Sequence, residues 1–243
     1  MEDRRTFIFP PPPTPAIPIH NDNLSESPAY FPVHRIYCVG RNYAEHAKEM
    51  GGDPNREPPF FFTKPHDAVV FCDPAKRPTR IPYPLATSNL HHEIELVIAI
   101  GKEGTNISPD DAPAHIFGYA VGVDLTRRDL QAAAKEARRP WDSAKGFDYS
   151  APIGPIYPSS TTIDDLESKH IWLQVNGGQR QSGVLMQMTW SVPRIVSFLS
   201  QQFNLVPGDL IFTGTPSGVG PIGKEDIVVG GCDGFGTVEF KIE

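Results

Sequence analysis

The spacing of apolar residues along the chain predicts more strands than helices. Short apolar runs with the length of strands recur from the first third of the sequence to its end. Asn176-Gly177 lies between two of these runs and is a typical sequence for a two-residue hairpin turn. The predicted strands are 35–39, 60–64, 93–100, 117–123, 171–175, 178–182, 209–213 and 237–242.

Three segments are expected to form helices, each with a start or stop signal. Asn42 can cap the first, Pro140 ends the second, and Pro193 lies in the first turn of the third. Because these helices do not alternate regularly with the strands, a doubly wound parallel sheet is disfavoured. The pattern therefore predicts a mixed, mainly β fold with peripheral helices, of the α+β class. The predicted helices are 43–50, 126–139 and 192–203.

The first 34 residues differ in composition from the rest. Residues 10–18 read PPPPTPAIP, with six prolines in nine positions, and predict a polyproline II arm without strand or helix. Residues 19–32 are polar and rich in turn formers, which is typical of a linker. We therefore expect a proline-rich N-terminal arm over 1–34 and one catalytic domain over 35–243. An arm that packs or frays is the simple interpretation, and a ligand for an SH3-type domain is the alternative.

Charge and cysteine content narrow the class of protein. The formal net charge of −7 and the pI of about 5.6 argue against a general nucleic-acid or anionic-membrane binder. No apolar stretch is long enough for a membrane helix, and no secretory signal is visible at the start. The three cysteines are far apart and odd in number, which favours a reducing, cytoplasmic location.

Glu93 and Glu95 stand at the start of the predicted strand over 93–100. Alternate side chains of a strand share a face, so both carboxylates point the same way, with Cα atoms roughly 6.5 Å apart. That face continues with Val97 and Ala99 and is expected to be buried. Two neighbouring buried carboxylates repel each other and need a metal ion, a basic side chain or a shared proton. A divalent ion is the simplest partner, and an edge strand with solvated glutamates is the alternative.

Asp124 ends the predicted strand over 117–123 and is followed by Arg128 and Gln131. If the helix begins at once, the three residues fall on one face and present a carboxylate, a guanidinium and an amide to one place. A solvated helix face with an ordinary ion pair is the alternative. Lys145 follows in a loop of small residues, where a lysine is usually exposed.

His46 and Glu49 are three residues apart on the first predicted helix, so their side chains can touch. A histidine oriented by a carboxylate is typical of a general base, and a surface polar pair is the alternative. Residues 214–220 form a glycine-rich loop after a predicted strand and carry Thr215. Backbone N–H groups and hydroxyls in such a loop can bind a small anion.

Taken together, these segments resemble the fumarylacetoacetate hydrolase family. The resemblance runs from about residue 35 to the C-terminus, and its motifs follow the family's order and approximate spacing. The run DPNREPPFFF over 53–62 looks most like the branch that hydrolyses fumarylpyruvate and related acylpyruvates. The motifs are YCVGRNY (37–43), FTKP (62–65), HEIEL (92–96), the stretch 124–131, AKGF (144–147) and GTPSGVG (214–220).

The resemblance implies a β-roll fold, usually dimeric, and a role for each matching residue. Glu93, Glu95 and Asp124 would be the metal ligands. His46 and Glu49 would be the water-activating pair, and Lys145 the third catalytic residue. Segment 44–58 would act as a lid over bound substrate. The substrate contacts would be Arg128 and Gln131 at the oxyanion, and Arg41, Lys64 and Thr215 at the carboxylate or diketo end.

The chemistry implied is metal-assisted cleavage of a carbon–carbon bond. Carboxylate ligands and open positions suit Mg²⁺ or Mn²⁺, with Ca²⁺ also compatible. The expected reaction converts fumarylpyruvate to fumarate and pyruvate in aromatic-compound degradation, by a cytoplasmic homodimer that binds a small keto acid. An oxaloacetate-type decarboxylase or a 2-hydroxymuconate-type isomerase would use the same metal enolate and is the alternative. A non-catalytic binding protein on the same scaffold is the remaining one.

Overall fold

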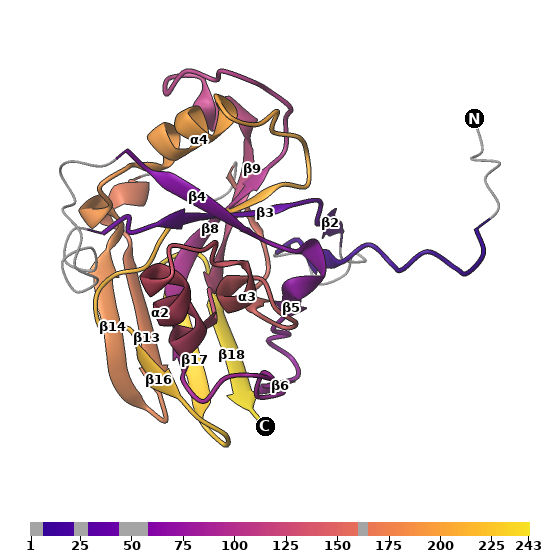
Figure 1. The fold of residues 1–243 in the computed structure, drawn as a ribbon. Coiled ribbons are helices and arrows are strands. Elements are labelled where there is room, and N and C mark those ends of the chain that lie inside the picture. The colour runs from indigo at the N-terminus through magenta and orange to yellow at the C-terminus, as the bar shows by residue number, and fades with distance from the viewer. Residues whose placement is uncertain (1–6, 22–28, 44–57, 160–164) are drawn as a thin grey trace.

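Mixed β-sheets make up most of the structure, and short helices cover their ends and faces (Figure 1). The structure is a computed structural model, and it describes residues 7–21, 29–43, 58–159 and 165–243. This is the mainly β, α+β arrangement that the sequence predicts. Its helices are α2 (Arg128–Glu136), α3 (Asp142–Lys145) and α4 (Val192–Ser200), with 3₁₀ turns at His66–Ala68, Ala112–His115, Leu166–Ser168 and Leu185–Gln187. Its strands are β1 (Ala16–Pro18), β2 (Tyr30–Pro32), β3 (Ile36–Gly40), β4 (Phe60–Lys64), β5 (Val69–Phe71), β6 (Thr79–Ile81), β7 (Leu90–His92), β8 (Ile94–Ile100), β9 (Ile116–Val123), β10 (Thr126–Arg127), β11 (Ala151–Ile153), β12 (Tyr157–Pro158), β13 (His170–Val175), β14 (Gly178–Val184), β15 (Leu210–Phe212), β16 (Gly220–Ile222), β17 (Ile227–Cys232) and β18 (Thr237–Ile242).

Strand β8 lies in the middle of the largest sheet, whose order is β4-β3-β15-β8-β9-β11-β5. It pairs antiparallel with both β9 and β15, whereas β15 pairs parallel with β3. All seven residues of β8 are buried, so both faces of this sheet are covered at that strand. The continuous apolar run in the sequence is the signature of such a doubly covered strand.

The two faces of β8 contribute to two different apolar cores. Ile94, Leu96, Ile98 and Ile100 join the larger core, which also receives residues from the second sheet. Val97 and Ala99 point the other way, into a smaller core. Glu95 shares the face of Val97 and Ala99, as the two-residue period of a strand predicts. The carboxylate therefore stands at one end of a buried apolar face.

The second sheet has the order β14-β13-β17-β18-β6 and packs against the larger core. Its β13–β14 hairpin confirms the prediction made from Asn176-Gly177. Both turn residues have positive φ, 51° for Asn176 and 76° for Gly177, as a type I′ turn requires. A small third sheet, β10-β7-β16, links this region to the start of β8, because β7 ends one residue before Glu93.

Helix α2 begins later than the sequence predicts. Thr126 and Arg127, expected in its first turn, instead pair with His91 and Leu90 as β10. Their backbone is therefore extended, and the helix starts at Arg128. The helix predicted over 126–139 is therefore shorter, Arg128–Glu136, because pairing with β7 competes with helix formation at its start.

Part of the N-terminal arm is a strand, which corrects the expectation of polyproline II throughout 10–18. β1 pairs antiparallel with β2, which lies in the expected linker. Ile17 and Phe31 are buried in the smaller core, so this pair covers part of the large sheet. Prolines are tolerated because β1 and β2 pair only with each other, as edge strands do. The division into an arm and a catalytic domain stays a prediction.

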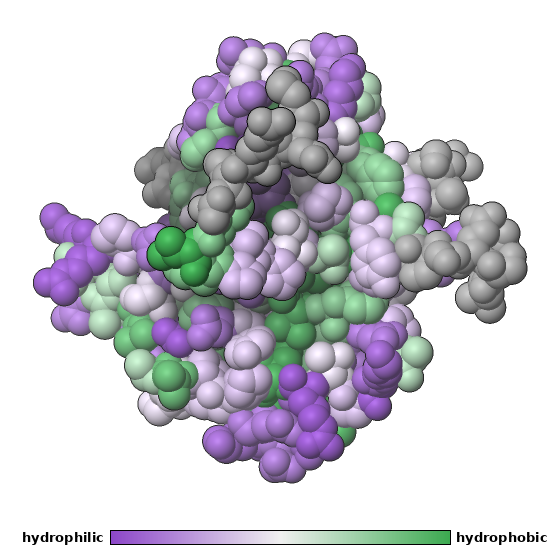
Figure 2. All heavy atoms as spheres, turned by 90° about the vertical axis from the view of Figure 1, so that its right-hand side faces the viewer, coloured by the Kyte–Doolittle hydropathy of each residue, from purple (hydrophilic) through white to green (hydrophobic). Residues whose placement is uncertain are grey.

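The outer part of the arm extends away from the sheets (Figure 1). It exposes three large apolar side chains, Phe7, Ile8 and Phe9. The face of the molecule on that side carries hydrophobic residues interspersed with hydrophilic ones (Figure 2).

The helices in the described part of the chain are all too short or too polar to span a bilayer.

Candidate metal centre and active site

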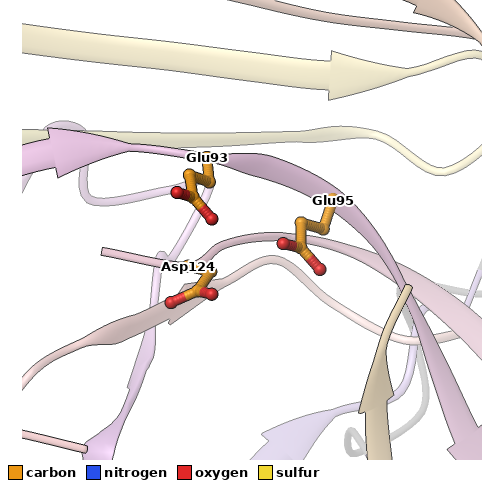
Figure 3. A group of neighbouring side chains, drawn as sticks. All are labelled: Glu93, Glu95 and Asp124. Atoms are coloured by element: carbon orange, nitrogen blue, oxygen red, sulfur yellow. The ribbon is translucent and has the colours of Figure 1, made fainter. Parts of the chain in front are cut away.

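Three buried carboxylates converge where β8 begins and β9 ends. Glu93 and Glu95 lie on either side of Ile94, and Asp124 directly follows β9 (Figure 3). Each offers an oxygen within 4.8 Å of the others, and all three residues are buried. The backbone N–H of Asp124 donates to the carbonyl of Glu93 at 2.8 Å, which holds the two strand ends together. The structure thus brings together the three residues that the sequence predicts as metal ligands.

Glu95 is the carboxylate whose charge is least compensated. Its Oε2 accepts a hydrogen bond of 2.7 Å from the backbone N–H of Gly214, and it forms no ion pair with the described residues. Gly214 has a φ of 95°, and a Cβ there would come within 2.7 Å of Asn42 Cβ, so a side chain is excluded. Burial, followed by repulsion from Asp124 and Glu93, raises the pKa of Glu95 well above its ordinary value.

The donor set of this cluster fits a hard divalent cation. Asp124 Oδ1 is paired with Lys64 Nζ at 2.8 Å, although this contact lacks hydrogen-bond geometry. Glu95 Oε1 has no partner among the described residues, and Glu93 lies beside both residues. Three carboxylates without a thiolate or a histidine suit Mg²⁺, Mn²⁺ or Ca²⁺ rather than Zn²⁺. A bound cation would supply the positive counter-charge that Glu95 lacks among the described residues.

Lys145, which the sequence suggested could be exposed, is buried at the end of α3. Its ammonium group donates to Asp124 Oδ2 at 2.6 Å, to Glu93 Oε2 at 2.9 Å and to Thr126 Oγ1 at 2.7 Å. Burial disfavours the charged form, but attraction from Asp124 and Glu93 outweighs it and raises the pKa of Lys145. The side chain is therefore a fixed cation beside the carboxylates.

Lys64 reaches the same carboxylates from another strand, β4. Its Nζ pairs with Asp124 and donates to the carbonyls of Leu125, at 3.1 Å, and of Lys145. The resemblance implies a contact with the substrate for this residue. In the structure Lys64 is buried against Asp124 and lies outside the set of residues that line the adjacent cavity. Its visible contacts are those of a residue that holds Asp124 in place.

Arg128 and Gln131 lie in the first turn of α2 and face Glu93. Arg128 Nη2 is 2.5 Å from Glu93 Oε1, and Nη1 donates to Gln131 Oε1 at 2.5 Å. Asp124 is not on this helix, so the one-face argument from the sequence does not apply to it. The residues still meet, because β10 turns the chain back along β7 before α2 begins.

The remaining residues that the resemblance implies as substrate contacts line a cavity beside the carboxylates. Thr215 follows Gly214 in the loop after β15, and Arg41 follows β3 with its guanidinium 5.9 Å from the ring centre of Phe60. Glu93 and Glu95 line this cavity, whereas Asp124 does not. The predicted contact residues that line it are Arg41, Arg128, Gln131, Lys145 and Thr215.

Two predicted catalytic residues, His46 and Glu49, lie outside the described residues, as does nearly all of the segment 44–58. Tyr43, just before them, forms an isolated bridge with Met188. The Asn42 side chain, expected to cap a helix, donates to the carbonyls of Trp190 and Thr213 and accepts from Trp190 N–H. Both ends of this amide are therefore used to anchor β3 to later parts of the chain.

An aromatic pocket of about 480 Å³ adjoins the cavity and was not foreseen from the sequence. Phe62, Trp141 and Lys145 line both spaces, so these three side chains stand between the pocket and the cavity. The Trp141 ring meets Phe60 edge-on, with ring centres 5.4 Å apart, and Arg139 stands on the wall. The aromatic run over 60–62 was the available sequence signal, but it does not reveal which face of β4 meets α3.

Gln181 was also not foreseen from the sequence as a residue of the site. It is fully buried, and its Nε2 donates a hydrogen bond to Thr215 Oγ1. It lies on β14, where it pairs in register with the buried Leu173 of β13. The predicted hairpin places both residues on the same inward face. A glutamine at such a position needs buried partners, which was the signal that the sequence held.

A known protein family and several of its members resemble this chain. The sequence model of the family described as "Fumarylacetoacetate (FAA) hydrolase C-terminal" matches residues 35–243. Two curated relatives are the mitochondrial oxaloacetate tautomerase of Arabidopsis thaliana and the mitochondrial oxaloacetate decarboxylase of Dictyostelium discoideum. Each is 40% identical over 209 residues, which is 86% of this chain and 91% or 93% of the relative.

Two solved structures cover more of the chain. The fumarylpyruvate hydrolase of Pseudomonas aeruginosa, in complex with Mn²⁺ and pyruvate, is 48% identical with a TM-score of 0.92 over 98% of this chain and 99% of that one. A putative fumarylpyruvate hydrolase of Burkholderia cenocepacia is 49% identical with a TM-score of 0.86 over 98% of each chain.

Proposed function

Since the chain belongs to the fumarylacetoacetate hydrolase family, whose members are enzymes, we propose that it is a metal-dependent acylpyruvate hydrolase with fumarylpyruvate as its first substrate. The products are fumarate and pyruvate. The observation that carries this proposal is the cluster of Glu93, Glu95 and Asp124 with Lys145 beside one cavity. A keto acid in that cavity would lie beside the carboxylates of Glu93 and Glu95 and beside fixed cationic side chains.

The metal ligands in this proposal are Glu93, Glu95 and Asp124, and the ion is Mg²⁺ or Mn²⁺. When bound, the ion supplies a Lewis acid that polarises the keto-acid oxygens. Asp124 keeps its position through Lys64, whose ammonium lies 2.8 Å from Oδ1 and which does not line the cavity. Glu95 is held by the backbone N–H of Gly214. The ligands are therefore oriented before the ion and the substrate arrive.

The remaining groups act on the acyl end of the substrate. Gln131 accepts from Arg128 through Oε1, so its NH₂ group remains to donate into the cavity. Lys145 and Arg128 add two fixed cations nearby. We assign the Gln131 amide as the donor to the oxyanion that forms when water attacks the acyl carbonyl, and the charges of Lys145 and Arg128 as its electrostatic stabilisation. A donor of this kind contributes roughly 3–4 kcal/mol in enzymes where one has been removed.

His46, oriented by Glu49, is the proposed base that takes the proton from the attacking water. A base must lie within hydrogen-bond reach of the water that attacks the carbonyl carbon, and an imidazole has the appropriate proton affinity near neutral pH. Arg41 and Thr215 are assigned to the carboxylate end of the substrate. Lys64 is assigned to Asp124 rather than to the substrate, because its contacts are used there.

An oxaloacetate tautomerase or decarboxylase is the second candidate, since the curated relatives carry those names. Two observations favour the longer acylpyruvate. The fumarylpyruvate hydrolase structure is 48% identical to this chain, whereas the oxaloacetate relatives are 40% identical. The aromatic pocket of about 480 Å³ also offers apolar surface next to the cavity for an acyl chain longer than that of oxaloacetate, which has only four carbons.

The test is a substrate panel with the purified protein. Fumarylpyruvate, acetylpyruvate, oxaloacetate and a 2-hydroxymuconate-type diacid are each incubated with Mg²⁺, Mn²⁺ or no metal. We expect release of fumarate and pyruvate, metal dependence, and loss of turnover in His46→Ala with metal binding intact. His66→Ala, an exposed histidine, is the matched control. Decarboxylation of oxaloacetate faster than fumarate release would favour the second candidate.

Location and assembly belong to the same proposal. We place the enzyme in the cytoplasm as a homodimer that acts on a small keto acid in aromatic-compound degradation. Two of the similar proteins are mitochondrial, so fractionation of the source cell tests the first point. Light scattering of the purified protein tests the second.

A further inference from the structure

The Gln181 side chain is a fully buried amide that links the metal-ligand strand to the loop that carries Thr215. Its carbonyl Oε1 accepts from His92 Nδ1 at 2.8 Å and from the backbone N–H of Ile94 at 3.1 Å. Its Nε2 donates to Thr215 Oγ1 at 2.7 Å and to the carbonyl of Pro216 at 2.8 Å. A primary amide has two donors and two acceptor sites, so every hydrogen-bonding position of this side chain is used.

The chemistry of two partners fixes which end of the amide is which. The backbone N–H of Ile94 can only donate, so the atom that it contacts must be the oxygen. The carbonyl of Pro216 can only accept, so the atom that it contacts must be the nitrogen. His92 must then donate through Nδ1, because the same Gln181 oxygen accepts from it. The orientation of Gln181 therefore follows from its neighbours.

This orientation determines the role of the Thr215 hydroxyl. Thr215 accepts the second N–H of Gln181, so its own proton points elsewhere. The hydroxyl donates to no group in the described part of the chain. Thr215 is only 2% exposed and lines the cavity together with Glu93 and Glu95. A buried hydroxyl with an unused proton at the wall of a cavity is a donor for whatever occupies that cavity.

We infer that Gln181 is a positioning residue that holds Thr215 as a hydrogen-bond donor toward an anionic oxygen of the bound ligand. The inference rests on the proposed function in one respect, that a keto acid occupies this cavity. The same amide binds the backbone of Ile94, between Glu93 and Glu95. One side chain from β14 therefore sets the position of the loop donor relative to the metal ligands.

Gln181→Glu is the sharpest test, because the two side chains are similar in shape. Glutamate keeps acceptors for His92 and Ile94 but has no N–H for Thr215. At pH 8 its carboxylate accepts the Thr215 proton and draws it away from the cavity. The matched control is Gln179→Glu, the same change at an exposed position of the same strand.

The readout is calorimetric titration of oxalate, a mimic of the pyruvate enolate, into the Mg²⁺-loaded protein. We expect oxalate to bind at least tenfold more weakly to Gln181→Glu and to Thr215→Val, while Thr215→Ser and Gln179→Glu stay within threefold of wild type. The double variant Gln181→Glu/Thr215→Val should be no weaker than the weaker single variant, because both changes remove the same donor. Affinity for Mg²⁺ alone should change less than threefold.

Each departure from this pattern has a defined meaning. Oxalate binding to Gln181→Glu at wild-type strength, or additive losses in the double variant, would overturn the role of Gln181. If Gln181→Glu does not fold, equal oxalate binding by wild type and Thr215→Val overturns the donor role instead. Absence of oxalate binding by the wild-type protein would contradict the proposed function as well as this inference.

Discussion

Lys64 and Asp124 form an ion pair in which neither side chain is accessible to solvent, with Nζ 2.8 Å from Oδ1. They come from β4 and from the end of β9, which are not neighbours in the large sheet. Removing one member of a buried pair leaves the other charge in a medium that solvates it poorly. The stability of the metal-free site therefore depends on this contact.

Lys64→Met should lower the free energy of unfolding of the metal-free protein by at most roughly 3–5 kcal/mol, the cost of breaking a buried ion pair, because Lys145 still pairs with Asp124 Oδ2. The loss should be smaller in saturating Mg²⁺, because the ion compensates Asp124. Urea unfolding followed by circular dichroism, with and without Mg²⁺, measures both values. Lys76→Met is the control, since Lys76 is 84% exposed and lies 3.6 Å from Asp73. Equal effects for the two variants would contradict the prediction.

Glu95→Gln should weaken Mg²⁺ binding by more than about tenfold. Removing even a group that only supports a metal ligand usually lowers metal affinity by at least about tenfold. Glutamine keeps an oxygen for the N–H of Gly214 but carries no charge. Calorimetric titration of Mg²⁺ checks the result. Glu225→Gln, at an exposed glutamate paired with Lys241, is the control and should bind Mg²⁺ as the wild type does.

The same variant should change the pH dependence of stability. Burial first, and then Asp124 and Glu93, raise the pKa of Glu95 above 4.5, so the folded metal-free protein holds this proton more tightly than the unfolded chain. The contribution of Glu95 to the unfolding free energy therefore decreases as the pH rises above about 4.5. Glu95→Gln lacks this contribution and should show a shallower decline with pH in chelator. A slope identical to that of wild type would show that Glu95 is charged without penalty.

Trp141→Ala should reduce kcat/KM for fumarylpyruvate by about tenfold or more, the usual effect of losing apolar contacts in a substrate pocket. Trp141 lines both the cavity and the aromatic pocket, so it is placed to contact a long acyl chain. Acetylpyruvate, with a two-carbon acyl group, should lose less than threefold. Trp172→Ala, on β13 of the other sheet, should leave the ratio of the two substrates unchanged. Equal losses for both substrates in Trp141→Ala would exclude a role in selectivity.

The three cysteines should resist thiol reagents in the folded protein, since all are free and buried. Burial raises the pKa of Cys72 and of Cys232 to about 12, and that of Cys38 well above its ordinary value. Little reactive thiolate is then present at pH 8. Ellman's reagent should detect no fast-reacting thiol in native protein and three per chain after denaturation. Rapid native labelling would show that one of these sites opens.

Features that depend on local geometry were accessible from the sequence. The two-residue period of a strand places Glu93 and Glu95 on one face, and the buried run after them predicts that this face is covered. Asn176-Gly177 predicts its hairpin because positive φ at both positions is a property of those two residues. The metal ligands could be proposed on this basis, together with the resemblance to the family.

Contacts between distant segments were decided only by the packing of the sheets. Lys64 meets Leu125 across 61 positions, and Gln181 meets Thr215 across 34. No period along the chain encodes which strand faces which, so the buried state of Lys145 and the aromatic pocket could not be read from sequence. The strands β1 and β2 form because Ile17 and Phe31 find a shared apolar surface on the large sheet. The sequence by itself determined which side chains share a face of a strand, because that follows from backbone geometry; the tertiary structure decided their partners, because burial of apolar surface selects how the sheets meet.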